Sequence, residues 1–146
     1  TDNGRDWEGD HPHEEINLLI EGGDYGWPND TPETPIPAGS IPPIAVWTPH
    51  TSVNGIDVRP PHSDLPGTNT TVYASVFGSW NTLLPQGHEI IRIDLGINGQ
   101  GQIIGEPIRF ATDLGTPLPL RFHPDGDLYY ATFGNGGTLY KISLKA

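Results

Sequence analysis

The stretch LRFHPDGDLYYATF, residues 120–133, decides the fold of this chain. Two apolar-rich runs flank Pro124-Asp125-Gly126, a tripeptide typical of a tight turn because proline presets one backbone angle and glycine accepts a positive one. Two short strands joined by such a turn form an antiparallel hairpin. The sequence therefore predicts antiparallel β structure in this part of the chain.

The hairpin belongs to an internal repeat of three apolar runs. One copy is GIDVR (55–59), VYASVF (72–77) and EIIRIDL (89–95), and the other is LRFHPDG (120–126), LYYATF (128–133) and LYKISL (139–144). A period near 50 residues with three or four strands per unit indicates the blades of a β-propeller. We predict that IAVWT (44–48) and PIRFA (107–111) are outer strands that carry the chain from blade to blade.

We therefore predict an all-β chain built from four-stranded antiparallel blades, about two and a half of them. The expected division is 1–48 for the end of one blade plus a proline-rich loop, 49–110 for a blade and 111–146 for the last blade. EINLLI (15–20) is predicted to be a strand, with a helix over 14–21 as the alternative. Because an open arc of blades exposes unpaired faces, we expect the remainder of the same propeller or a second copy to cover them.

Composition excludes several classes of function. The 146 residues carry 7 Lys plus Arg against 18 Asp plus Glu, a net charge of −11 that argues against nucleic-acid binding. The 19 glycines and 16 prolines leave little room for long helices. The absence of cysteine excludes a disulfide scaffold, a thiolate zinc site and a cysteine nucleophile. No apolar run approaches the roughly 18 residues that a membrane-spanning helix needs.

Three motifs at the front of the chain resemble the glucose/sorbosone dehydrogenase family: DNGRDWEGD (2–10), EEINL (14–18) and EGGDYGWP (21–28). The later GSWN (78–81) and the closing PDG turn with LYKI also match the family pattern. The resemblance covers essentially the whole chain and corresponds to the C-terminal half of such an enzyme. It implies a six-bladed propeller that uses pyrroloquinoline quinone (PQQ) and Ca²⁺ to oxidise a sugar.

The resemblance assigns a cofactor role to the turn holding Asn3, Gly4 and Arg5. In the family this turn lies at the central channel, where a side chain contacts the quinone and two backbone carbonyls bind Ca²⁺. Carbonyl oxygens suit a hard cation, and glycine allows the backbone to approach closely. The alternative is a glycine turn in which Arg5 pairs with Asp2 or Asp6.

A second calcium site is implied at Glu15 and Tyr25, where relatives bind a structural Ca²⁺ through a carboxylate and a backbone carbonyl. The acidic neighbours Glu14, Glu21 and Asp24 strengthen the local field for a divalent cation. The alternative interpretation of this segment is a solvated acidic face.

The aromatic and histidine residues give weaker indications. Trp47 falls where relatives place a ring against the cofactor plane, with a core tryptophan as the alternative. Trp80 is predicted to be a packing anchor rather than a ligand. His11 and His13 flank a proline and have no evident third ligand, so the sequence does not favour a zinc site there.

Two hypotheses for function follow. In the first, the chain is part of a PQQ- and Ca²⁺-dependent dehydrogenase acting on the C1 hydroxyl of an aldose or a related alcohol. In the second, the propeller is a calcium-stabilised binding or structural module without catalysis. Phe77, Thr82 and TPLPL (116–120) stand where relatives often carry cations, which favours the second hypothesis, and the motifs at the front favour the first. The family's catalytic base is a histidine in the other half of the enzyme, so we expect this chain alone to be inactive.

The expected location is extracytoplasmic, either periplasmic or secreted, because the family is usually exported. Asn29-Asp-Thr31 and Asn69-Thr-Thr71 fit the acceptor pattern for N-glycosylation in surface loops.

Overall fold

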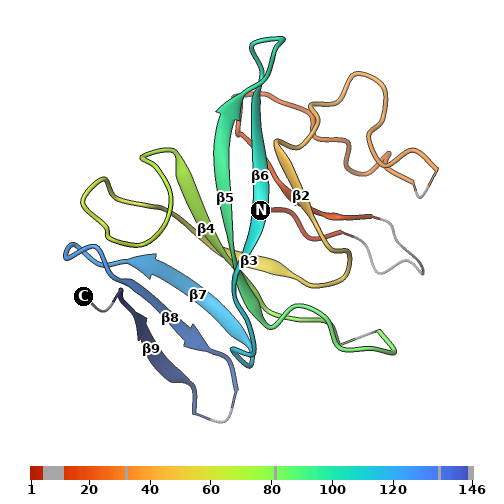
Figure 1. Cartoon of the computed structure of the whole chain (residues 1–146). Helices are drawn as coiled ribbons and strands as arrows, with labels where there is room; N and C mark the ends of the chain where they lie inside the picture. Colours follow the sequence, from red (N-terminus) through yellow and green to blue (C-terminus); the bar gives the residue numbers. More distant parts are fainter. Residues whose placement is uncertain (5–11, 32, 81, 135, 145–146) are drawn as a thin grey trace.

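The chain folds into three antiparallel sheets arranged as a fan (Figure 1). The computed structural model describes residues 1–4, 12–31, 33–80, 82–134 and 136–144. All regular secondary structure in these ranges is β-strand. The strands are β1 (Glu14–Ile16), β2 (Ala45–Trp47), β3 (Val53–Val58), β4 (Thr71–Val76), β5 (Glu89–Ile97), β6 (Ile103–Ala111), β7 (Pro117–Phe122), β8 (Leu128–Thr132) and β9 (Thr138–Ile142). The sheets are β1–β2, β3–β4–β5–β6 and β7–β8–β9, so each strand pairs with its neighbour in sequence. The predicted all-β, antiparallel class is confirmed.

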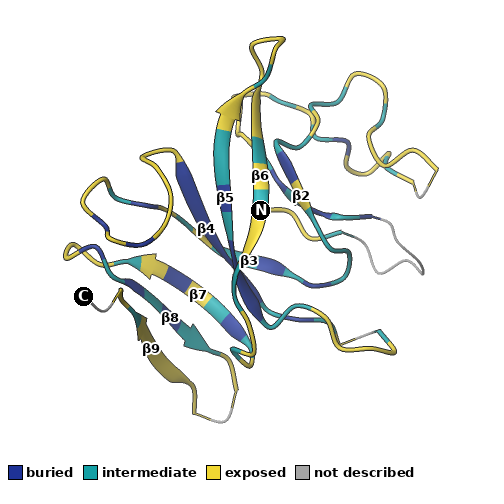
Figure 2. Cartoon of the chain, in the orientation of Figure 1, coloured by how far each residue is buried: buried dark blue, intermediate teal, exposed yellow. Residues whose placement is uncertain are grey.

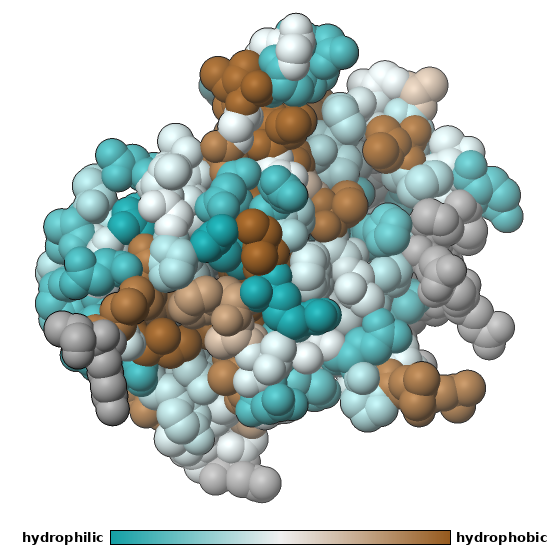
Figure 3. All heavy atoms as spheres, viewed as in Figure 1, coloured by the Kyte–Doolittle hydropathy of each residue, from teal (hydrophilic) through white to brown (hydrophobic). Residues whose placement is uncertain are grey.

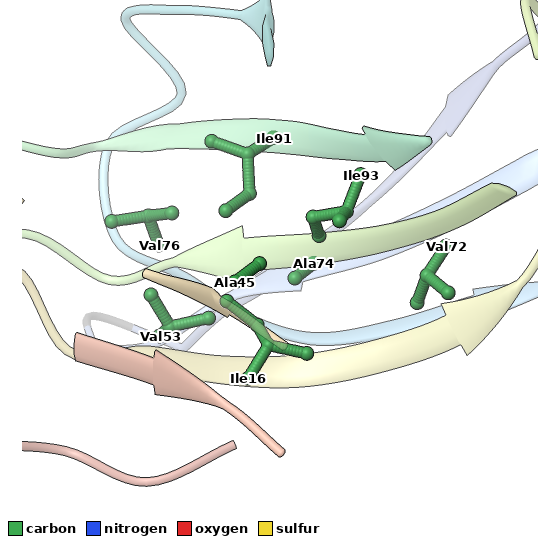
Figure 4. Packing of buried hydrophobic residues seen from close by; sticks show 8 residues of the cluster. All are labelled: Ile16, Ala45, Val53, Val72, Ala74, Val76, Ile91 and Ile93. Atoms are coloured by element: carbon green, nitrogen blue, oxygen red, sulfur yellow. The ribbon is translucent and has the colours of Figure 1, made fainter. Parts of the chain in front are cut away.

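The middle sheet is sandwiched between the other two, and β4 is buried along its whole length (Figure 2). Successive side chains of a strand point to opposite faces. Val72, Ala74 and Val76 therefore pack on one side, against Ile16 and Ala45 of the β1–β2 sheet (Figure 4). The other side of β4 packs against the last sheet.

That second core contains Tyr73, Ile90, Leu120, Leu128 and Tyr130. It joins the middle sheet to the β7–β8–β9 sheet across a close backbone approach. A Cβ added at Gly55 would lie 2.6 Å from the carbonyl oxygen of Leu118, so only glycine fits this position without displacement.

The predicted outer strands are confirmed as β2 and β6, which lie side by side through a bond from the Gly105 N–H to the Ile44 carbonyl. β6 begins at Ile103, four residues before the predicted start, and includes Pro107. A proline is tolerated there because an outer strand needs to pair on one side only.

The prediction for residues 15–20 is corrected at its C-terminal end. β1 stops at Ile16, and the helix considered for 14–21 is not formed. The Tyr25 hydroxyl donates to the Leu18 carbonyl and accepts from the Ile20 N–H, both at 2.7 Å. The phenol thereby bonds to the Leu18 carbonyl and the Ile20 N–H. In a longer strand or a helix, these two groups would bond to other backbone groups.

The last sheet has three strands within the described residues, β7, β8 and β9, one for each of the three predicted runs. Its final strand, β9, is exposed over most of its length (Figure 2). No helix in the described part of the chain is long and apolar enough to cross a membrane.

Candidate cofactor and cation site

The N-terminal turn is fixed against β1 by backbone pairing. Asp2 and Glu15 exchange two N–H to carbonyl bonds of 2.9 Å each. A Cβ at Gly4 would lie 2.7 Å from Pro12 Cγ and 2.8 Å from the Pro12 carbonyl oxygen. A glycine is therefore required where the turn passes this backbone.

A cavity of about 130 Å³ opens beside this turn. Its lining includes Asn3, Gly4, Glu15 and Tyr25. The sequence placed these residues in two separate sites, and the structure brings them to the walls of one cavity. Arg5, the third residue of the predicted cofactor turn, lies outside the described residues.

The cavity is acidic, and the neighbouring carboxylates affect the pKa of the Glu15 carboxyl. Burial raises the pKa of its carboxyl, and the nearby Asp2 and Asp30 carboxylates raise it further. The Asn17 amide opposes this shift by donating to Glu15 Oε2 at 3.2 Å. A cation bound beside Glu15 would relieve this repulsion.

Two further oxygens make the donor set suitable for a hard cation. The Tyr25 residue lines the cavity and brings its backbone carbonyl, and the buried Asn17 Oδ1 has no hydrogen-bond partner within the described residues. Ca²⁺ takes carboxylate and carbonyl oxygens of this kind. Three or more His, Cys, Asp or Glu side chains do not converge on one point anywhere in the described ranges, so Ca²⁺ here would rely on backbone and amide oxygens beside Glu15. The residues present fit the calcium that the resemblance implies.

Trp47 lies elsewhere. It ends β2, and its indole N–H donates to Glu89 Oε1 at 3.0 Å. The Arg109 guanidinium lies 5.7 Å from the ring centroid and pairs with Glu89. Trp47 does not line the cavity beside Asn3, and its contact with the cofactor plane stays a prediction.

The prediction for Trp80 as a packing anchor is wrong, because 77% of this side chain is exposed. It lies in the β4–β5 loop with Leu83 and Leu84, which are exposed as well. Figure 3 shows apolar atoms at the surface where this loop projects from the fan. Phe77, which precedes the loop, packs against Phe133 at 6.0 Å between centroids.

Glu14, which the sequence indicates only as an acidic neighbour of Glu15, has a more specific place in the structure. The structure leaves 1% of it exposed, and burial raises the pKa of its carboxyl. The feature of the sequence that indicates this burial is the alternation of side chains between the two faces of a strand. Glu14 and Ile16 share a face of β1, so a core position carries a carboxylate.

Comparisons with known proteins show the fold. No protein-family model matches the sequence, and no curated protein matches it. Among solved structures, a calcium structure of a Trichoderma reesei enzyme of carbohydrate-active enzymes family AA12 matches with a TM-score of 0.64 and 22% identity, covering 99% of this chain and 46% of that one.

Two sugar dehydrogenases match as well. The holo form of the pyranose dehydrogenase PQQ domain from Coprinopsis cinerea gives a TM-score of 0.53 at 19% identity, with 73% of this chain and 30% of that chain covered. An oxidoreductase described as a glucose dehydrogenase from Thermus thermophilus gives 0.62 at 20%, with 90% and 34% covered.

The fold is therefore that of the PQQ-type sugar dehydrogenase propellers, as the resemblance implied. This chain spans less than half the length of each of these structures.

Proposed function

We propose that this chain is part of a PQQ- and Ca²⁺-dependent dehydrogenase that oxidises a sugar or related alcohol. The proposal rests on the convergence of the Asn3–Gly4 turn, the Glu15 carboxylate and Tyr25 on one cavity. It is supported by a fold shared with the PQQ domain of pyranose dehydrogenase and with a glucose dehydrogenase.

The chain's own residues would bind and orient rather than carry out the proton transfer. When bound, PQQ accepts a hydride from the carbon that bears the substrate hydroxyl. The Asn3 amide offers donors and an acceptor at the cavity, and Gly4 presents backbone without a side chain. Glu15 and the Tyr25 carbonyl would hold Ca²⁺. The base that takes the hydroxyl proton is expected outside this chain.

The test uses the full-length protein that contains this chain, titrated with PQQ and Ca²⁺ while the quinone absorbance is followed. We expect saturable binding and bleaching on addition of an aldose. Asn3→Ala is expected to weaken PQQ binding, and Asn69→Ala, in an exposed loop far along the chain, serves as its matched control. A protein that never binds PQQ would refute the dehydrogenase.

The cation is tested separately by thermal unfolding. Ca²⁺ should raise the melting temperature of the wild type by mass action, because it binds the folded form. Glu15→Gln should abolish this rise, whereas Glu106→Gln, an exposed glutamate on β6, should retain it. An equal calcium response in all three proteins would exclude Glu15 as a ligand.

The alternative function is a calcium-stabilised binding or structural propeller without catalysis. The contact between Phe77 and Phe133 favours it, because an aromatic pair occupies a place where relatives often carry a cation. Calcium stabilisation without PQQ binding is the result that would select this alternative.

We also propose that the chain works beside the remainder of its propeller or a second copy, in an extracytoplasmic compartment. The exposed β9 supports the first point, because its outer edge leaves N–H and C=O groups for another strand. Sedimentation of the full-length protein would distinguish a completed monomer from a dimer.

A further inference from the structure

Glu14 occupies the centre of a small backbone cradle formed by the turn before β3. Its Oε1 accepts the Thr51 N–H at 3.1 Å. Burial raises the pKa of this carboxyl, and the backbone N–H groups of Ser52, Val53 and Thr51 oppose that rise. Its other oxygen, Oε2, is buried and has no hydrogen-bond partner within the described residues. Backbone N–H groups of a turn can bind an anion, and here the anion held by the Thr51 N–H is an internal side chain.

The cradle is held in a conformation that the backbone alone disfavours. His50 has a φ of 60° and Ser52 a φ of 57°, both in the left-handed region that non-glycine residues rarely adopt. Such residues persist only where surrounding contacts determine them. The charge-assisted bond from the Thr51 N–H, between these two residues, to the Glu14 carboxylate is a contact of this kind, and such bonds are about twice as strong as neutral hydrogen bonds.

The same turn contacts the cavity described above. Ser52 Oγ accepts the Asn3 side-chain amide at 3.3 Å and the Asn54 amide at 3.0 Å. The Thr1 hydroxyl donates to the Asn54 carbonyl at 3.2 Å. The N-terminal turn therefore contacts Ser52 and Asn54, which follow the residue whose N–H donates to Glu14.

The opposite side of the turn is joined to the end of β4. The Phe77 N–H donates to the Ser52 carbonyl at 2.9 Å, and the Gly78 N–H donates to the Thr51 carbonyl at 2.8 Å. If the turn moved, both the Asn3 side of the cavity and the start of the β4–β5 loop would move with it.

We propose that Glu14 is a positioning residue for the cofactor site: its buried carboxylate holds the turn at 51–53, and through Ser52 this turn sets where the Asn3 amide lies. The two adjacent glutamates then have different tasks on opposite faces of β1. Glu15 faces the cavity for a cation, and Glu14 faces inward to organise the backbone that supports Asn3. The cofactor part of this proposal rests on the proposed function, whereas the coupling from Glu14 to Asn3 does not.

The test compares Glu14→Gln with the wild-type full-length protein. Glutamine keeps the shape and one acceptor oxygen but removes the charge. By NMR we expect the Thr51, Ser52 and Val53 amides to exchange with solvent about tenfold faster or more, and the Asn3 side-chain amide signal to shift. PQQ binding should weaken by about fivefold, which corresponds to loss of one neutral hydrogen bond. The calcium-dependent rise in melting temperature should remain, because Glu15 is intact.

Ser52→Gly provides a second variant that relieves the left-handed strain while removing the hydroxyl. It should reproduce the Asn3 signal shift and the weaker PQQ binding, and it keeps the proposal testable if Glu14→Gln does not fold. The double variant should bind PQQ no more weakly than the single variant with the lower affinity, because both substitutions disturb the same chain of contacts from Glu14 to Asn3. Gln100→Ala, at an exposed position in the turn between β5 and β6, serves as the control and should leave both the Asn3 signal and PQQ binding unchanged.

The outcomes separate the two proposals. If the wild type fails to bind PQQ, the proposed function is wrong, and the amide exchange and the Asn3 signal still decide the role of Glu14. A purely structural Glu14 would lower the melting temperature of Glu14→Gln without moving the Asn3 signal or the PQQ affinity, and that result would overturn the proposal.

Discussion

The sharpest quantitative prediction concerns Tyr73, at the centre of β4. This side chain is fully buried, and its hydroxyl donates to the Pro66 carbonyl at 2.6 Å. Its ring meets Phe110 and Phe122 edge-on, at centroid distances of 5.0 and 5.3 Å. Burial raises the pKa of the Tyr73 phenol to about 12, despite an opposing effect of nearby arginines. Tyr73→Phe removes the hydroxyl and leaves the ring packing in place.

The magnitude follows from the pKa difference between the two states. The unfolded phenol ionises near pH 10, and the folded one near pH 12. Since the folded pKa is raised, its contribution to stability is fully present below pH 10 and is lost as the pH rises to 12. A difference of two pKa units between the folded and unfolded states corresponds to about 2.7 kcal/mol of unfolding free energy. At pH 7 the substitution should cost roughly 1 kcal/mol, for one hydrogen bond.

Together these values predict that the two stability curves cross. The wild type should be more stable than Tyr73→Phe by roughly 1 kcal/mol at neutral pH. The two proteins should be equally stable at about pH 11, and the wild type should be less stable than the variant at pH 12. Urea unfolding followed by tryptophan fluorescence at pH 7 to 12 measures this. Tyr129→Phe, at a partly exposed tyrosine, controls for general alkaline effects. A difference between wild type and Tyr73→Phe that stays constant over this range would refute the reasoning.

Three further predictions concern packing. Gly55→Ala should destabilise the chain by about 1–3 kcal/mol, because its methyl group would press on a carbonyl of β7, whereas Gly96→Ala, with open space around it, should be nearly neutral in urea unfolding. Leu128→Ala should cost about 2–5 kcal/mol in the same assay, since this side chain is fully buried in the second core, and a loss below 1 kcal/mol would contradict the described packing. Glu89→Ala should leave the Trp47 indole N–H without its carboxylate, at a cost of about 1–3 kcal/mol. Near-UV circular dichroism should change in that variant, and an unchanged tryptophan signal would exclude the contact.

Much of the sheet structure could be predicted from local patterns. The predicted runs at 72–77 and 128–133 agree with β4 and β8 within one residue at each end, because short apolar-rich runs bounded by turn formers specify strands locally. The ends of β1 and β6 were missed. Each depends on a contact that residue types along the chain do not specify, the Tyr25 phenol for β1 and the long pairing with β5 for β6.

The candidate site was predicted only in part. Motif resemblance selected Asn3, Gly4, Glu15 and Tyr25, and the structure brings all four to one cavity. The same reasoning selected Trp47, which contacts Glu89 and Arg109 and lies outside this cavity; its contact with the cofactor stays a prediction. Motif matching compares residue types along the chain, and it does not report which face of a strand a side chain occupies.

By itself, the sequence determined the all-β class, the order of the strands and the acidic character of the chain, since these depend on residue type and spacing within about ten positions. Only the tertiary structure decided that Glu14 turns inward and Glu15 toward the cavity, and that Ser52 accepts a hydrogen bond from Asn3. The reason is physical. A carboxylate becomes either a solvated charge or an internal anion according to the backbone amides that surround it, and the amides around Glu14 come from residues 37 or more positions away.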